Sequence, residues 1–130
     1  MPIYEITPVA KPRMTQRDKW LKPPRYIVAR YWYFKDLVRG FGVDLSESGA
    51  HVIFYMPMPE SWSKKKRERM NGEPHKQVPD IDNLQKALLD ALFDNDSHVW
   101  DIRATKRWAV EGSIVINHGD ERKRGGGKVR

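Results

Sequence analysis

The sequence predicts a single small α+β domain with the element order β-α-β-α-β-β, in which a small mixed sheet carries two main helices. Three observations predict this class. The 130 residues are about the modal length of one domain. Apolar residues make up 39% of the chain and include five Trp, five Tyr and four Phe, which favours an ordered, aromatic-rich core. Two segments repeat apolar residues at helical spacing, whereas others alternate as strands do. We expect the domain to span residues 1–118 and residues 119–130 to form a disordered basic tail.

The first half of the chain predicts a strand, a basic loop, a helix and a second strand. Residues 4–7 alternate weakly before a proline, which is typical of a short edge strand, and residues 10–22 form a basic loop without an apolar period. A helix is expected from Pro23-Pro24 to Gly40, because apolar residues recur at intervals of 4, 3 and 4, namely Ile27, Tyr31, Phe34 and Val38. Residues 50–56 are β-branched or aromatic at most positions and predict a well-covered strand.

The second half predicts a helix and two strands. Residues 61–76 are expected to form a mobile basic loop. A core-facing helix over residues 83–93 follows from a stripe at i, i+3, i+4, i+7 and i+8, with Asp82 or Asn83 as its cap: Leu84, Ala87, Leu88, Ala91 and Leu92. Residues 99–108 alternate as a half-buried strand with Trp100, Ile102, Ala104 and Trp108 on its apolar face. The turn at Glu111-Gly112 predicts that this strand forms a hairpin with residues 113–117.

The charge balance restricts the class of partner. Lys and Arg number 24 against 17 Asp and Glu, so the formal net charge is +7, which favours a polyanion or an anionic membrane. No stretch approaches 18 apolar residues and the N-terminus lacks an apolar signal core, so we expect a cytoplasmic protein without a membrane partner. The absence of Cys excludes disulfides, thiolate metal sites and Cys nucleophiles.

Basic residues concentrate in two segments, 11–25 and 64–76, which we interpret as contacts to the phosphates of DNA. A merely solvated surface is the alternative. The candidate DNA-binding residues are Lys11, Arg13, Arg17, Lys19, Lys64, Lys65, Lys66, Arg67, Arg69 and Lys76.

Two carboxylates, Asp80 and Asp82, stand at the start of the second predicted helix. A helix cap explains Asp82 alone, but a second acid two residues away adds like-charge repulsion that capping does not require. A bound cation removes that repulsion, and Mg²⁺ is commonly held by one or two carboxylates together with water and substrate phosphate. Paired carboxylates on a basic protein therefore indicate metal-assisted phosphodiester chemistry.

The ligand set and the role of nearby residues stay open at this level. An EF-hand is excluded, because Gln85 and Ala91 occupy the places of its glycine and its bidentate glutamate. Lys86 lies four residues after Asp82 and four before Asp90, so it belongs either to an exposed ion-pair ladder or to a site that stabilises phosphate charge in the transition state. A third ligand is wanted, and Asp94, Asp96 and Asp101 are equally eligible; His75 and His98 are weaker candidates.

The combined motif resembles the RusA family of Holliday-junction endodeoxyribonucleases, most closely over residues 79–108. The matching string is D80-x-D82-N83-L84-Q85-K86-A87, then D90-A91-L92, then D96-S97-H98-V99. The resemblance implies a RusA-like fold, Asp80, Asp82 and Asp96 as metal-binding catalytic carboxylates, and Lys86 as an essential lysine. It also implies a homodimer that uses Mg²⁺, with Mn²⁺ as a substitute, to resolve four-way DNA junctions by paired nicks. Many such proteins are encoded by prophages, which implies a bacterial or phage origin.

The sequence departs from the family pattern at Asn95, where the family commonly has a second acid, and residues 1–60 match only in outline. Two other functions therefore stay open. One is a structure-specific DNA-binding module that does not cut, with the carboxylates serving as caps and ion-pair partners. The other is a less selective nuclease that acts on flaps, single strands or RNA.

Overall fold

Strand β2 (Ala50–Pro57) is paired on both edges inside a four-stranded mixed sheet. The computed structural model describes residues 2–94 and 96–118, and the sheet order is β1-β4-β2-β3. β2 is parallel to β3 (Ile102–Ala109) over eight residue pairs and antiparallel to β4 (Ser113–Asn117), which in turn pairs with the edge strand β1 (Ile3–Tyr4). The predicted α+β class and the order of the main elements are confirmed.

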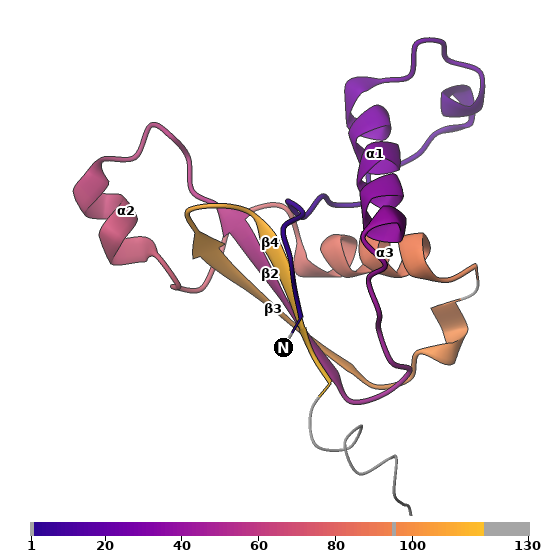
Figure 1. The fold of residues 1–130 in the computed structure, drawn as a ribbon. Coiled ribbons are helices and arrows are strands. Elements are labelled where there is room, and N and C mark those ends of the chain that lie inside the picture. The colour runs from indigo at the N-terminus through magenta and orange to yellow at the C-terminus, as the bar shows by residue number, and fades with distance from the viewer. Residues whose placement is uncertain (1, 95, 119–130) are drawn as a thin grey trace, which may run out of the picture.

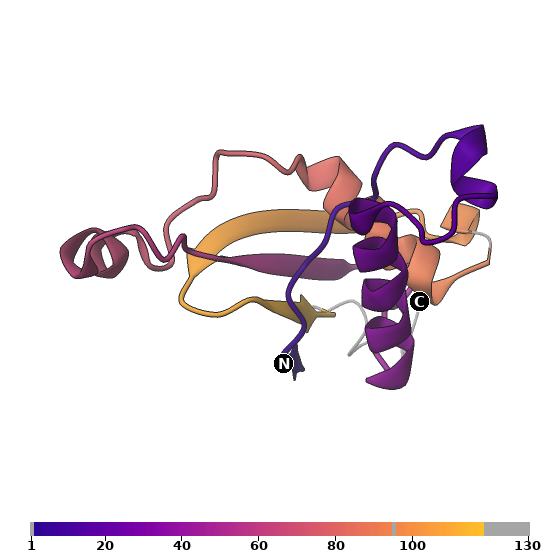
Figure 2. The same ribbon diagram turned by 90° about the horizontal axis from the view of Figure 1, so that it is seen from above.

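The core lies between one face of this sheet and two helices, α1 (Tyr26–Gly40) and α3 (Ile81–Leu92). Alternate side chains of β2 are buried against the helices, whereas the intervening ones lie on the more open face. Figures 1 and 2 show α1 and α3 together at one end of the sheet. The strand residues buried in this core are Ala50, Val52, Phe54, Met56, Trp108, Ile114 and Ile116.

Helix α1 has the predicted extent but a slightly different buried face. Val28 is fully buried, whereas Ile27 is 46% exposed, because the stripe that contains Tyr31, Phe34 and Val38 is continued by Val28. The helix ends at Gly40, as predicted, but Gly40 itself is helical. Gly42 has φ +66, and the Val43 N–H donates to the Val38 carbonyl oxygen at 3.3 Å, so Gly42 rather than Gly40 supplies the left-handed residue.

The predicted hairpin between the last two strands is wrong. β3 and β4 do not pair, because β2 lies between them and bonds to both. The short connection passes over the end of β2, and a Cβ added at Gly112 would stand 2.7 Å from the Thr7 hydroxyl oxygen, so only glycine fits there. Strand β3 begins later than predicted, at Ile102, and Trp100, which precedes it, is 71% exposed.

The basic segment 61–76 contains a helix where a loop was predicted. Helix α2 (Lys64–Met70) begins after Ser63, whose hydroxyl accepts a hydrogen bond from the Lys66 N–H at 3.1 Å, and its Lys, Arg, Glu and Met residues all favour helix. Figure 1 shows α2 at the end of the sheet remote from α1 and α3. A 3₁₀ turn, η1 (Gln16–Lys19), likewise interrupts the predicted loop 10–22.

The expected basic tail, residues 119–130, lies outside the described residues. Within the described part of the chain, no helix is both long enough and apolar enough to cross a lipid bilayer.

Candidate metal and nucleic-acid site

Asp80 and Asp82 lie at the start of α3 with both side chains exposed. Asp80, rather than Asp82 or Asn83 as predicted, is the N-cap residue, and its backbone carbonyl accepts from the N–H groups of Asn83 and Leu84 at 3.2 Å. Its carboxylate makes no capping hydrogen bond, and Asp82 lies inside the first turn. Among the described residues neither carboxylate has an ion-pair partner within 4 Å, so capping and ion pairing do not account for these acids.

Lys106 on β3 fixes the backbone that leads into Asp80. Its ammonium donates to the carbonyl oxygens of Gln77 and Pro79, each at 2.7 Å. The same strand holds this segment through its backbone, since the His75 N–H donates to the Lys106 carbonyl at 3.1 Å. Burial lowers the pKa of Lys106, and the nearby Asp80 charge acts in the opposite direction. A strand residue thus positions the approach to the paired acids.

Lys86 faces a basic hollow of roughly 390 Å³ beside the start of α3. The hollow is lined by Lys11, Pro12, Arg13, Asn83 and Lys86, so it combines a helix residue near Asp82 with the first basic loop. The loop is fixed there because the Lys11 N–H donates to the Asn83 carbonyl at 3.0 Å. Arg13 and Lys86 are both exposed, so the hollow suits an anion such as a phosphate.

Asp90 on α3 bonds to α1 and to the first basic loop. Its Oδ2 accepts from the Tyr31 hydroxyl at 2.7 Å and from the Lys11 ammonium at 2.8 Å. Burial alone would raise the pKa of Asp90, but these two bonds outweigh it and hold the pKa below its usual range. Asp90 is therefore occupied by structural contacts, and Lys11 is committed to it rather than free for DNA.

An apolar cleft of roughly 360 Å³ lies on the other side of the same loop. Val78 and Ile27 in its lining are 83% and 46% exposed. Pro79 also lines the cleft, so it directly adjoins Asp80, and Lys11 and Pro12 separate it from the basic hollow. The remaining lining residues are Pro8, Val9, Ala10, Arg30 and Met56.

The three candidates for a third carboxylate ligand lie beyond the other end of α3. Asp94 follows the helix, and the backbone of Asp96 begins the 3₁₀ turn η2 (Asp96–His98). Asp101 immediately precedes β3. Figures 1 and 2 both show η2 at the end of α3 remote from Asp80. Among the described residues, no group of three or more His or acidic side chains is gathered as a metal site.

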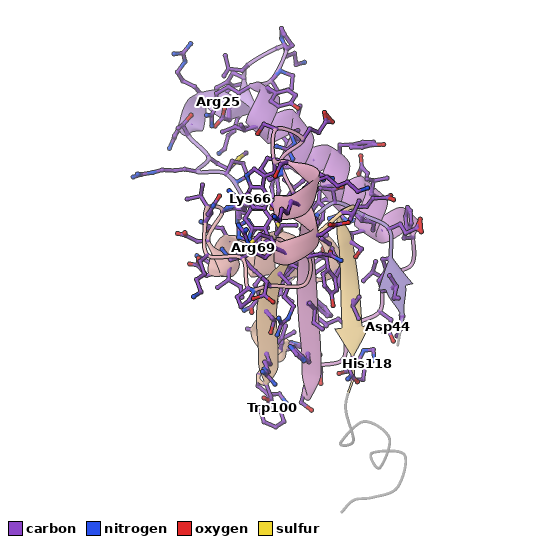
Figure 3. The ribbon with its side chains drawn as sticks, turned by 90° about the vertical axis from the view of Figure 1, so that its left-hand side faces the viewer. Arg25, Asp44, Lys66, Arg69, Trp100 and His118 are labelled. Carbon is purple, nitrogen blue, oxygen red and sulfur yellow. The ribbon has the colours of Figure 1, made fainter. Side chains whose placement is uncertain are left out.

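In the two basic segments, some Lys and Arg side chains make contacts within the protein, whereas others are exposed. On α2, Lys66 lies 4.3 Å from the centroid of the Trp62 ring and Arg67 donates to the Pro59 carbonyl at 2.8 Å, so both help to hold the helix. Lys64, Lys65 and Arg69 are exposed, as is Lys76 beyond the helix. Figure 3, in which α2 faces the viewer, shows Lys66 and Arg69 on this helix and Arg25 beyond it, at the top of the view.

The first basic segment is organised by an ion pair between the buried Asp18 and the exposed Arg25. Asp18 is 3% exposed and accepts from the Arg25 Nε and Nη2, each at 2.8 Å, and from the Thr15 N–H at 2.7 Å. The Arg25 hydrogen bond, followed by the Thr15 bond, holds the pKa of Asp18 well below its usual range. The exposed cations on this loop are Arg13, Arg17, Lys19 and Lys22.

The histidines considered as ligands have structural contacts. His75 is 6% exposed and packs on Trp108 with ring centroids 4.1 Å apart. Burial, followed by the Lys106 charge, lowers the pKa of His75, which therefore stays neutral near pH 7. His98 is exposed, with its Nδ1 3.7 Å from a Glu47 carboxylate oxygen.

A comparison with protein-family profiles matches residues 4–117 to the family described as Endodeoxyribonuclease RusA. The chain belongs to the RusA family. The match covers most of the chain and confirms the resemblance drawn from the motif around Asp80. The comparisons with curated proteins and with solved structures give no match. Membership places this chain in a family of endodeoxyribonucleases and supports a nuclease activity.

Sequence reasoning missed Lys106 and the apolar cleft of this RusA family member. A signal for Lys106 was present, because it falls on the apolar face of its strand together with Ile102, Ala104 and Trp108. A lysine at such a position has a buried stem and a polar contact to satisfy. The cleft had no local signal, since its walls come from four separate parts of the chain.

Two side chains at the start of α3 are suited to act as ligands of a hard divalent cation. Asp80 and Asp82 supply exposed carboxylate oxygens, and Mg²⁺ commonly binds one or two carboxylates and fills its remaining positions with water and substrate phosphate. Lys86 and Arg13 beside them are suited to that phosphate.

Proposed function

We propose that the protein is a Mg²⁺-dependent endodeoxyribonuclease that resolves Holliday junctions and related branched DNA by paired nicks, with Mn²⁺ as a substitute ion. The observation that carries the proposal is the pair of uncommitted carboxylates, Asp80 and Asp82, beside a basic hollow. Membership of an endodeoxyribonuclease family supports the same reaction class.

The proposed reaction is hydrolysis of one phosphodiester bond. Asp80 and Asp82 would hold the ion, which when bound would supply an activated water and neutralise phosphate charge. The water oxygen attacks phosphorus, the bond to the 3′ oxygen breaks, and that oxygen takes up a proton, leaving a 3′-hydroxyl and a 5′-phosphate. Lys86 and Arg13 stabilise the charge that develops on the phosphate, and Lys106 holds the backbone before Asp80 in place.

The arrangement of the basic segments supports a long DNA substrate. Figures 1 and 2 show the start of α3 between α2 at one end of the molecule and the loop with η1 at the other. Lys64, Lys65 and Arg69 on α2 are exposed on one side of the acids, and Arg13, Arg17 and Lys19 on the other. Cations spread in this way can contact phosphates on both sides of a cut.

The apolar cleft beside Asp80 supports branched DNA over intact duplex. The faces of stacked bases are covered in a duplex, whereas a branch point offers bases that are already partly unstacked. Opening a base in this state costs less than opening one in a duplex. A cleft lined by Val78 and Ile27, and by Pro79 directly before the proposed metal ligand Asp80, suits such a base.

We propose that the active form is a homodimer. A four-way junction has near two-fold symmetry, and two identical subunits related by a two-fold axis present two equivalent sites to two strands. Paired nicks on strands of like polarity follow from that symmetry.

A cleavage gel with a labelled four-way junction tests the function. We expect paired nicks in Mg²⁺ and none in EDTA, and weaker cutting of duplex, flap and single-stranded competitors. Binding without cutting in Mg²⁺ would support the DNA-binding module instead. Equal cutting of all the competitors would support the less selective nuclease.

A further inference from the structure

Exposed aromatic side chains occur at the start of α1 and on the loop before it. Tyr26 and Tyr33 on α1 are 75% and 65% exposed, and Trp20 on the loop is 79% exposed. A single apolar side chain in solvent needs no explanation, whereas several large ones in one region indicate a binding surface.

The two tyrosines lie on one side of α1 together with Arg30. Positions 26, 30 and 33 fall within about 60° of one another around a helix axis, because each residue turns by about 100°. The guanidinium carbon of Arg30 is 5.9 Å from the centroid of the Tyr26 ring, so the cation stands over the ring. A ring, a cation and a second ring therefore follow one another along the helix.

An ion pair fixes the loop that carries Trp20 against the start of α1. Arg25 is the N-cap residue of α1, and its guanidinium donates to both carboxylate oxygens of Asp18, in η1, at 2.8 Å. Trp20 directly follows η1, and Tyr26 directly follows Arg25. Figures 1 and 2 show η1 beside the start of α1. The exposed rings of the loop and of the helix are thus carried on parts of the chain that the ion pair holds together.

We propose that an aromatic surface on this part of the molecule binds an unpaired stretch of a DNA strand by stacking on its bases. Its members are the exposed side chains Trp20, Tyr26, Arg30 and Tyr33. The inference rests on the proposed function, which supplies DNA as the substrate. Aromatic rings among cations are typical of single-strand binding, because rings stack on bases and cations attract phosphates. Arg17 and Lys19 on η1 are exposed and add positive charge beside the surface.

Arg30 connects the aromatic surface to the proposed active site. It lines the apolar cleft together with Ile27 and Pro79, and Pro79 directly precedes Asp80. A strand that leaves the cleft therefore continues onto α1. Bases within an intact duplex are covered by their neighbours, so the surface adds affinity for unpaired strands rather than for duplex.

Binding in EDTA to two labelled ligands of equal length tests the surface. One is oligo-dT, and the other is an abasic phosphodiester chain, which carries the same phosphate charge without bases. We expect the parent to bind oligo-dT more tightly, as measured by fluorescence anisotropy. Tyr26→Ala and Trp20→Ala should each weaken oligo-dT binding by about 5- to 150-fold, since each removes one stacking ring. Their affinity for the abasic chain should hardly change.

Two variants serve as controls. Tyr26→Phe retains the ring and should retain the affinity for oligo-dT. Trp100 is 71% exposed, and Figure 3 shows it far from Arg25, so Trp100→Ala should bind both ligands as the parent does. Equal affinity of the parent for the two ligands would overturn the proposal. A loss of oligo-dT affinity in Trp100→Ala equal to that in Tyr26→Ala would also overturn it.

Sedimentation of Tyr26→Ala and Tyr33→Ala tests a second copy of the chain as the occupant. We expect the mass of the parent, and dissociation into lighter species would overturn the DNA assignment. If the parent nicks junctions in Mg²⁺ but does not prefer oligo-dT, the aromatic surface is wrong while the proposed function stands. If the parent prefers oligo-dT through these rings but does not nick, the aromatic surface stands and the proposed function fails.

Discussion

The ammonium of Lys106 on β3 donates to the carbonyl oxygen of Pro79 at 2.7 Å, one residue before Asp80. A second bond to the Gln77 carbonyl has the same length. Through this relationship the sheet determines where the first proposed metal ligand stands, although Lys106 is not itself a ligand.

Lys106→Met should weaken metal binding and lower stability. Loss of two hydrogen bonds from a charged group should reduce the free energy of unfolding by about 1–3 kcal/mol. Loss of a group that orients a ligand should raise the half-saturating Mn²⁺ concentration about 10- to 100-fold, measured without DNA. Removing a positive charge near the ion would by itself lower the half-saturating Mn²⁺ concentration. A rise in this concentration therefore indicates lost positioning of Asp80, and a fall indicates only the lost charge. Lys76→Met, an exposed lysine in the same segment, is the control for metal binding.

Lys86→Ala should reduce kcat at saturating Mg²⁺ and DNA by about 10²- to 10³-fold, the usual effect of losing one positioned electrostatic donor. Lys86 is exposed, so the melting temperature should hardly change. Lys86→Arg retains the charge with a different shape and should recover part of the rate. If Lys86→Ala nicks junctions at the parental rate, Lys86 is an exposed surface residue without a role in catalysis.

The free cations of α2 should determine the salt dependence of junction binding. Each phosphate contact adds about 0.7 to 0.9 to the slope of log affinity against log salt, so replacing Lys64, Lys65 and Arg69 by Gln should flatten it by about 2. Replacing Lys66 and Arg67, which contact Trp62 and Pro59, should instead lower the melting temperature with a smaller change in slope. An unchanged slope in the triple variant would show that α2 does not contact DNA.

The ion pair between Asp18 and Arg25 should make the free energy of unfolding depend on pH in acidic solution. The pKa of Asp18 is lowered in the folded protein, so the unfolded chain binds the proton more tightly. The contribution of the pair is present above the unfolded pKa of about 3.9 and is lost as pH falls below it towards the folded pKa. Asp18→Asn should flatten the dependence of chemical unfolding on pH below about 4. Arg25→Gln should do the same, and the double variant should add nothing further.

The sequence correctly predicted the elements whose pattern depends only on neighbouring residues. The apolar stripe of α3 is confirmed at Leu84, Ala87 and Leu88, because a helical period depends only on neighbouring residues. The position of β2 between β3 and β4 was missed, because strand pairing is non-local and the turn at Gly112 gives no sign of which strand it will meet. Helix α2 was missed because its charged residues have no apolar stripe, although they favour helix individually.

In the candidate site, too, the sequence predicted only the residues that are neighbours along the chain. The motif predicted Asp80, Asp82 and Lys86 as site residues, and they lie close together because they are neighbours in sequence at the start of α3. The distance from Asp80 to the acids after α3 depends on where the helix ends and how β3 returns, so no spacing rule revealed it. Lys106 acts across the sheet and was visible only as a lysine on an apolar face.

Asp80→Asn and Asp82→Asn, compared for nicking and for junction binding in Mg²⁺, test the central claim most directly. The account predicts that each variant loses nicking by about 10²-fold or more, while affinity for the junction in EDTA is retained or improved because a negative charge has been removed. Asp36→Asn, an exposed acid on α1, should nick at the parental rate. Parental nicking by Asp80→Asn or Asp82→Asn would contradict the claim that these two carboxylates hold the catalytic ion.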